Sequence, residues 1–408
     1  MKQAQRVLST YAVDMFGIAS ALFELGGLVV MHDASGCNST YDTHDEPRWY
    51  DTPSMVYISG LNEIDTIQGN DQRLIHDIAE VTDAVHPAFI AIGGSPMPNA
   101  IGTDFRAIEK MVQERTGIFT MGFRTDGIHS YLPGAGNAYV RLAQHFLKRP
   151  FRQPQRPARR INILGLTPLD FSVVGNATAI KTILTEAGFI IQSSWSMGDT
   201  LDNLSEAANA DVNAVVSSTG LYLAQYMQEQ YGIPYVAGIP MGKQGTADWL
   251  QALREGDTSY LTGLTGREPR EKPQYALADL NAWKTETVYD DQPCDALVIG
   301  EPVYLLSMGN LLRHELGLST VRLLCPLADA PQLLLRHIET VSVEPVIREE
   351  CRKAQHVLAD PIYARLLPEK QDAFISLPHE AYSGRHYHDE MPVIAGPDIA
   401  DWLRDRLK

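Results

Sequence analysis

Short apolar runs alternate along the chain with amphipathic segments, and this alternation predicts the fold. Continuous runs such as Leu28–Met31, Ala88–Ile92 and Ala296–Ile299 predict buried strands, because the strands of a parallel sheet are covered on both faces. Between such runs apolar residues recur at helical spacing, as in Val13–Leu25 and Asp71–Ala84. The repeated order of strand, turn and helix predicts an α/β protein with mainly parallel sheets and helices on both faces.

The same order occurs in three successive stretches, which predicts three domains rather than one large sheet. The basic, proline-rich stretch Lys148–Arg160 is typical of a linker. We expect three Rossmann-like domains, over residues 1–155, 156–275 and 276–408.

The first domain contains an unusual stretch, in which the apolar run before His32 leads through small residues to Cys37. A thiol at the carboxyl end of a strand is well placed to bind iron or to act as a nucleophile, whereas a buried, inert cysteine is the other interpretation. No second cysteine lies close to Cys294, Cys325 or Cys351, so we expect these three to be structural.

A polar segment, residues 38–50, follows Cys37 and is dense in groups that titrate or donate hydrogen bonds, including His44 and Arg48. It could line a site, and a solvated surface loop is the alternative interpretation.

Composition narrows the class of protein. A net charge of −16 argues against a nucleic-acid-binding protein, which normally has a basic face. Four cysteines among 408 residues do not form a disulfide scaffold. No signal peptide is recognisable, and Phe16–Met31 is short for a bilayer span and contains Glu24, so we expect a cytoplasmic protein without a membrane segment.

Motifs for other chemistries are incomplete. The turns that begin at Gly93, Gly134 and Gly165 all miss the third glycine of the dinucleotide fingerprint. Gln244 follows Gly242-Lys243 where a P-loop needs serine or threonine, and there is no nucleophile elbow. We therefore expect that this chain binds no nucleotide.

Five segments, in order, resemble motifs of the nitrogenase component 1 superfamily, which includes the nitrogenase molybdenum–iron subunits, their cofactor scaffolds and the dark-operative protochlorophyllide reductase. The stretch from His32 to Cys37 resembles the His-Gly-Pro-x-Gly-Cys loop of that superfamily. The other four segments are Glu63–Leu74, Pro96–Asp104, Leu223–Pro234, and Gly300–Pro302 taken together with Ser383–His386.

Fuller members of the superfamily use three cysteines per chain to hold an iron–sulfur cluster at the subunit interface. Of these three positions only Cys37 keeps its thiol; the earlier one falls near Asp14 and the later one near Ser95. The position that would hold the catalytic metallocluster falls near Val216 or Ser217, so we expect no such metallocluster here.

The resemblance implies an iron–sulfur cluster of the [4Fe–4S] type, shared between subunits. Such a cluster needs about four ligands, of which one chain would supply Cys37 and a carboxylate, Asp14 or Asp33, with Ser95 nearby. The rest would come from a second copy or from a paralogous component 1 subunit, in a dimer or a tetramer. The alternative is that no cluster binds and Cys37 is vestigial.

The resemblance also implies an oxidoreductase: a subunit of a nitrogenase-like reductase, with a separate ATP-dependent iron protein as its electron donor. His32, His44 and Arg48 are the candidates for proton delivery or substrate contact. A non-catalytic scaffold or carrier for metallocluster assembly is the alternative function. The sequence does not name the substrate.

Overall fold

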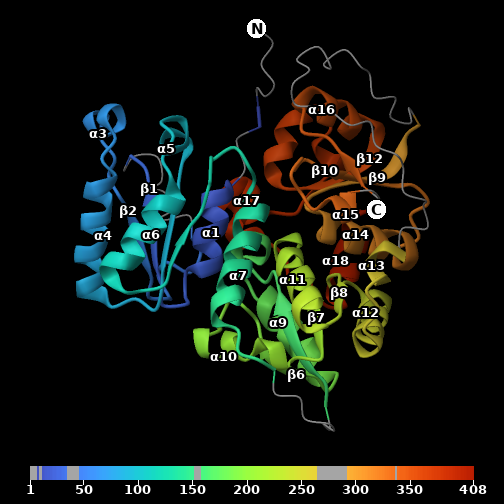
Figure 1. Cartoon of the computed structure of the whole chain (residues 1–408). Coiled ribbons are helices and arrows are strands. Elements are labelled where there is room, and N and C mark those ends of the chain that lie inside the picture. Colours follow the sequence, from blue (N-terminus) through green and yellow to red (C-terminus); the bar gives the residue numbers. More distant parts are fainter. Residues whose placement is uncertain (1–6, 9–11, 35–45, 151–157, 264–291, 336–337) are drawn as a thin grey trace.

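The computed structural model describes residues 7–8, 12–34, 46–150, 158–263, 292–335 and 338–408. Figure 1 shows three separate parallel sheets, the first in blue and cyan, the second in green and the third in orange and red. The predicted α/β class with parallel sheets is therefore confirmed. The exact domain boundaries remain predictions, because residues 151–157 and 264–291 lie outside the described ranges.

The first sheet has the order β2-β1-β3-β4, with all pairs parallel. Successive residues of β1 point to opposite faces. Leu28 and Val30 pack with α4 and α6, whereas Val29 and Met31 pack with α1 and α7. Its elements are β1 (Leu28–His32), β2 (Met55–Ile58), β3 (Ile90–Gly94), β4 (Thr120–Gly122), α1 (Asp14–Leu22), α3 (Glu63–Gln68), α4 (Asp71–Val85), α5 (Pro96–Ala100), α6 (Phe105–Thr116) and α7 (Tyr131–Phe146).

The second sheet has the order β6-β5-β7-β8 and is also parallel. Helix α7 joins it to the first unit, and the fit is close: a Cβ on Gly136 of α7 would lie 2.3 Å from the Tyr222 ring of α11. Its elements are β5 (Arg160–Leu164), β6 (Ile190–Ser193), β7 (Val212–Val215), β8 (Tyr235–Ala237), α8 (Pro168–Phe171), α9 (Asn176–Glu186), α10 (Leu201–Ser205), η2 (Ala207–Asn209), η3 (Ser218–Gly220), α11 (Leu221–Tyr231), α12 (Lys243–Glu255) and α13 (Tyr260–Gly263).

The third sheet has the order β11-β10-β9-β12-β13. After β13 the chain returns to the second unit, where the side chain of Asn176 binds the backbone of Pro392 and Ile394. Its elements are β9 (Cys294–Ile299), β10 (Val321–Cys325), β11 (Glu339–Thr340), β12 (Ala354–Ala359), β13 (Phe374–Ser376), α14 (Pro302–Asn310), η5 (Leu311–Glu315), α15 (Gln332–Leu335), α16 (Glu344–Lys353), η6 (Pro361–Leu366), η7 (Gln371–Ala373), α17 (Glu380–Ser383), η8 (Gly384–Glu390) and α18 (Asp398–Arg406).

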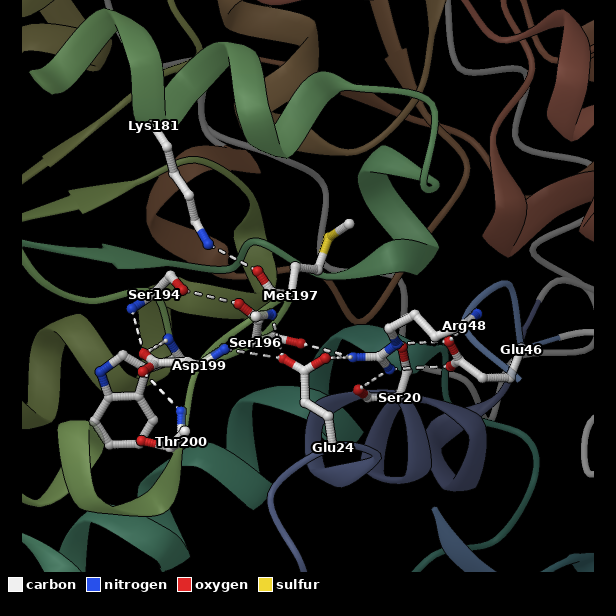
Figure 2. A network of polar contacts seen from close by, with 12 residues as sticks. Ser20, Glu24, Glu46, Arg48, Lys181, Ser194, Ser196, Met197, Asp199 and Thr200 are labelled. Carbon is white, nitrogen blue, oxygen red and sulfur yellow. Dashed lines mark hydrogen bonds and ion pairs between the residues drawn. The ribbon is translucent and has the colours of Figure 1, made fainter. Parts of the chain in front are cut away.

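A buried ionic network joins the first unit to the second (Figure 2). The Arg48 guanidinium lies 2.7 Å from Glu46 and 3.3 Å from Glu24, and donates to Ser196 of the second unit at 3.1 Å. Glu24 in turn accepts the backbone N–H of Gly198 at 2.7 Å. The network thus connects Arg48 and Glu46 of the first unit to Ser196 and Gly198 of the second.

The loop that receives Arg48 is itself strained. Trp195 and Met197 have φ angles of 61° and 55°, a left-handed conformation that side chains other than glycine rarely adopt. The Asp199 carboxylate accepts the N–H groups of Ser194 and Trp195, and Lys181 donates to the Met197 carbonyl oxygen. These bonds hold the loop in a shape that presents Ser196 and Gly198 to the first unit.

Replacing Arg48 by alanine should strongly destabilise the protein. The change leaves the carboxylates of Glu24 and Glu46 buried without their main cation, which is expected to lower the free energy of unfolding by about 3 to 5 kcal/mol. Urea unfolding of Arg48→Ala measures the change. The control is Arg73→Ala: Arg73 pairs with Asp65 at 2.7 Å but is 48% exposed, so we expect a loss below about 1 kcal/mol. Equal losses in the two variants would contradict this account of the network.

Candidate functional site

The carboxyl ends of β1, β3 and β4 meet at one edge of the first sheet, and most of the described candidate residues lie there. His32 ends β1 directly opposite Gly94 of β3. Ser95 follows Gly94, and the turn Phe123–Gly127 follows β4. This edge of an open parallel sheet is where ligands usually bind.

Asp14 lies at this edge, in the first turn of α1. Its carboxylate accepts the backbone N–H groups of Met15, Asp126 and Gly127 at 2.8, 2.9 and 3.1 Å. Burial raises the pKa of Asp14 to about 6, although these hydrogen bonds act in the opposite direction. At neutral pH the carboxylate is therefore ionised, and it keeps a free lone pair for a metal ion.

Ser95 and Asp14, two residues proposed from the sequence, are brought together by one glycine. Gly127 donates to Asp14 and packs against the residue after Ser95: a Cβ on Gly127 would lie 2.4 Å from Cδ of Pro96. The φ angle of Gly127 is 65°, so this position favours glycine. Ser95 is buried and begins α5, where its hydroxyl accepts the N–H of Met97 at 3.4 Å.

Two further side chains lie at this edge that the sequence did not indicate as site residues. Asp126 and His129 lie 2.8 Å apart, and together with Asp14 they bring donor atoms within 4.8 Å of one another, which is close enough to bind one metal ion. The hydrogen bond to Asp126 raises the pKa of His129. The sequence signal for these two residues is weak: they come shortly after the short strand β4, at the end of the strand where ligands usually bind.

His32 is 6% exposed, and its Nδ1 atom lies 2.8 Å from the hydroxyl of Ser59. Burial lowers the pKa of the imidazole, so His32 is neutral at physiological pH. Its ring packs edge-on against Phe105. These contacts fix the ring at the edge of the sheet, and its role in proton delivery stays a prediction.

The remaining predicted residues are placed differently. Cys37 and His44 lie outside the described residues. Arg48 is described, and its guanidinium belongs to the buried network that joins the first two units. It lies in that network and its predicted role in proton delivery or substrate contact stays a prediction.

The described cysteines lie away from this edge, in the third unit. Cys294, Cys325 and Cys351 are all buried. Burial raises the pKa of Cys294 to about 11 and that of Cys351 to about 12, so both are thiols at neutral pH. Within the described ranges, therefore, the first sheet's edge offers oxygen and nitrogen donors, and Cys37 would have to supply the sulfur.

A second candidate site lies where the carboxyl ends of the second and third sheets face each other. Asp170, Glu301, Asp360 and His379 line a pocket of about 20 Å³, enough for one water molecule. Burial, helped by the charge of Asp170, raises the pKa of Glu301 to about 7. Burial also raises the pKa of Asp360. Neither lysine nor arginine is among the described residues that line this pocket.

Among the described carboxylates that line this acidic pocket, Asp170 accepts hydrogen bonds from the most side chains. It accepts hydrogen bonds from Tyr131 at 2.6 Å and from Thr167 and Ser217 at 2.7 Å. Nε2 of His379 lies 3.6 Å away, and Nδ1 of the same ring accepts the N–H of Ala381. Nε2 therefore carries the proton and points toward Asp170.

The acidic pocket does not fit the catalytic metallocluster of the fold family. The sequence places the position expected to hold it near Val216 or Ser217, and the Ser217 hydroxyl is bonded to Asp170. The volume, the buried carboxylates and the lack of a thiolate among the described lining residues all disagree with a large anionic cluster.

No helix in the described part of the chain is long and apolar enough to cross a membrane.

Known proteins resemble this chain both in sequence and in fold. The nitrogenase iron-molybdenum cofactor biosynthesis protein NifE of Methanosarcina barkeri is 26% identical over 54% of this chain and 51% of the relative. One of the subunits of the light-independent protochlorophyllide reductase of Prosthecochloris aestuarii is 24% identical, over 69% of this chain and 54% of the relative. The chain thus spans about half the length of these relatives.

A solved structure titled nitrogenase Cp1 at pH 6.5 superimposes with a TM-score of 0.70, covers 100% of this chain and 94% of that chain, and is 12% identical, which supports the fold. The family model of the nitrogenase component 1 type oxidoreductases matches residues 15–348. The chain therefore belongs to the nitrogenase component 1 type oxidoreductase family, as the motifs predicted.

Proposed function

We propose that this chain is a subunit of a nitrogenase-like reductase, supplied with electrons by a separate ATP-dependent iron protein. The observation that carries the proposal is the meeting of Asp14 and Ser95 at one edge of the first sheet, beside the strand that leads to Cys37. Two cluster-ligand positions suggested by the sequence are thereby adjacent in space.

A [4Fe–4S] cluster would be held by Cys37 and Asp14 together with ligands of a second chain, and when bound it would supply one-electron transfer. Asp14 fits this role, since its carboxylate is ionised at neutral pH, is oriented by three backbone amides and retains a lone pair. The second chain is a copy of this one or a paralogous component 1 subunit.

The acidic pocket suits proton handling at the reacting end of a substrate. A reduction consumes protons with electrons, and Glu301, with a pKa of about 7, can hold or release a proton near neutral pH. Its carboxylate is fixed by the N–H groups of Ser218, Val303 and Tyr304. His379 and Asp170 lie in the same pocket, 3.6 Å apart, and Asp170 is held by a hydrogen bond from Tyr131. Burial raises the pKa of Tyr131 well above its ordinary value, so this phenol keeps its proton and positions Asp170. The pocket admits only a small group, so the rest of the substrate would lie outside it.

A scaffold or carrier for metallocluster assembly is the second candidate function. The similarity to NifE favours it. The absence of a cofactor cysteine near Val216 or Ser217 fits a scaffold and a reductase equally well. Turnover distinguishes the two functions. With the iron protein and ATP, a reductase oxidises many reductant equivalents per subunit, whereas a carrier stops after one load.

Replacing Cys37 by alanine should remove the iron. We expect protein reconstituted without oxygen, together with its partner chain, to contain iron and acid-labile sulfide and to give a cluster signal in electron paramagnetic resonance, and Cys37→Ala to lose all three. Cys294→Ala is the control, because this thiol is buried in the third unit, and it should keep the signal. Iron-free wild-type protein, or equal iron in Cys37→Ala, would exclude the proposed ligand.

Replacing Asp14 by asparagine should leave the fold intact but weaken the cluster. The amide oxygen can still accept the N–H groups of Met15 and Gly127, whereas the hydrogen bond from the Asp126 N–H to the second oxygen and the negative charge are lost. The expected result is an altered resonance spectrum and faster loss of iron to a chelator, with at most a small fall in melting temperature. Identical spectra for wild type and Asp14→Asn would show that Asp14 is not a ligand.

The acidic pocket should also give stability a pH dependence. Burial raises the pKa of Glu380, which accepts from Ser172 beside this pocket, from 4.5 to about 7. Between these values the folded state keeps a proton that the unfolded chain has released, so stability falls as pH rises, by up to about 3 kcal/mol.

Glu380→Gln should therefore flatten the decline in unfolding free energy between pH 4.5 and 7. Urea unfolding at several pH values measures it, with the exposed Glu349→Gln as control. A decline as steep in Glu380→Gln as in wild type would refute the assignment.

A further inference from the structure

A second, larger pocket lies between α12 of the second unit and the end of α14 in the third. It encloses about 290 Å³, close to the smallest volumes of small-molecule sites. It is separate from the acidic pocket and shares no lining residue with it. The residues that line it are Gln244, Gly245, Asp248, Asn310, Leu311, His314 and Glu315.

The side chain of Asn310 is the strongest sign that this pocket binds something. Asn310 is 8% exposed, yet its side chain makes no capping hydrogen bond. It faces α12, where a Cβ on Gly245 would lie 3.7 Å from its Nδ2 atom. Its amide is not among the buried polar atoms of the described residues that lack a partner, so it is open to the pocket and can bond to a ligand there.

The backbone beside Asn310 is also unusual. Leu311–Glu315 forms a π-helical turn, in which Leu316 donates to the carbonyl of Leu311 at 3.1 Å. Turns of this kind are rare and are found frequently at functional sites. The Glu315 carboxylate accepts the N–H groups of Lys243 and Gln244, so the turn is tied to the start of α12 and the two walls of the pocket are held together.

The charge of the pocket indicates the class of ligand. Asp248 and Glu315 contribute two carboxylates, and neither lysine nor arginine is among the described lining residues. Gln244 donates to one oxygen of Asp248 at 2.8 Å, which leaves the other oxygen available. A site rich in acceptors and negative charge repels anions and attracts cations that carry N–H groups.

We propose that this pocket binds a small organic cation with N–H donors, an amine or an amidine, through the Asn310 amide and the Asp248 carboxylate. The site goes beyond the proposed function and requires no iron, so it is tested on wild-type protein whether or not a cluster is bound.

Calorimetric titration with 1,4-diaminobutane, at constant ionic strength, tests the proposal. We expect saturable binding to wild type and none of succinate, a dianion of matched length. Asn310→Leu and Asp248→Asn should each weaken binding by about tenfold or more, since each removes a hydrogen bond to a charged ligand. Asn310→Leu should not lower the melting temperature, because the Asn310 side chain makes no capping hydrogen bond that the change would remove.

The matched control lies on the same helix. Gln251 and Glu255 repeat the pair formed by Gln244 and Asp248, but outside the pocket. Glu255→Gln should change the affinity by less than about twofold, as expected for a screened surface charge. Equal weakening by Glu255→Gln and Asp248→Asn would reveal non-specific attraction to an acidic surface and overturn the proposal. So would tighter binding of succinate, absence of binding to wild type, or unchanged affinity in Asn310→Leu.

Discussion

The carboxylate of Asp14 is the interaction on which the candidate cluster site depends. By accepting three backbone amides it joins the start of α1 to the turn after β4, and Gly127 of that turn packs against Pro96 at the start of α5. Three segments distant in the sequence are thereby fixed at one edge of one sheet. The same bonds orient the carboxylate in a buried place, where it would be unstable without them.

The molecule combines a retained architecture with an altered chemistry. The three parallel sheets bring strand ends together at the first sheet's edge and again between the second and third sheets. At the latter place the Ser217 hydroxyl donates a hydrogen bond to Asp170. Buried carboxylates with pKa values near 7, such as Glu301, make this pocket suited to protons rather than to a large anionic group.

Much of the fold could be predicted from the sequence, because buried parallel strands are continuous apolar runs. The runs at Leu28–Met31 and Ala296–Ile299 correspond to β1 and β9. The helical stretch expected over Asp71–Ala84 corresponds to α4, whereas the one expected over Val13–Leu25 ends earlier, since α1 ends at Leu22. Strand β12 was missed, since its polar residues interrupt the apolar pattern.

The candidate sites were predictable only in part. Asp14 and Ser95 were predicted from the resemblance to known motifs. Asp126, His129 and Asp170 can be recognised as candidate site residues only from their tertiary contacts. Arg48 illustrates the opposite case. Its polar neighbourhood in the sequence indicated a site, but long-range contacts with Glu24 and Ser196 place it in a buried network.

The most direct test of the account is anomalous X-ray diffraction at the iron edge, on crystals grown without oxygen from protein reconstituted with iron and sulfide together with its partner chain. The account predicts an iron peak between two chains, within bonding distance of Cys37 and Asp14. An iron peak inside a single chain and away from these residues, or no peak at all, would contradict it.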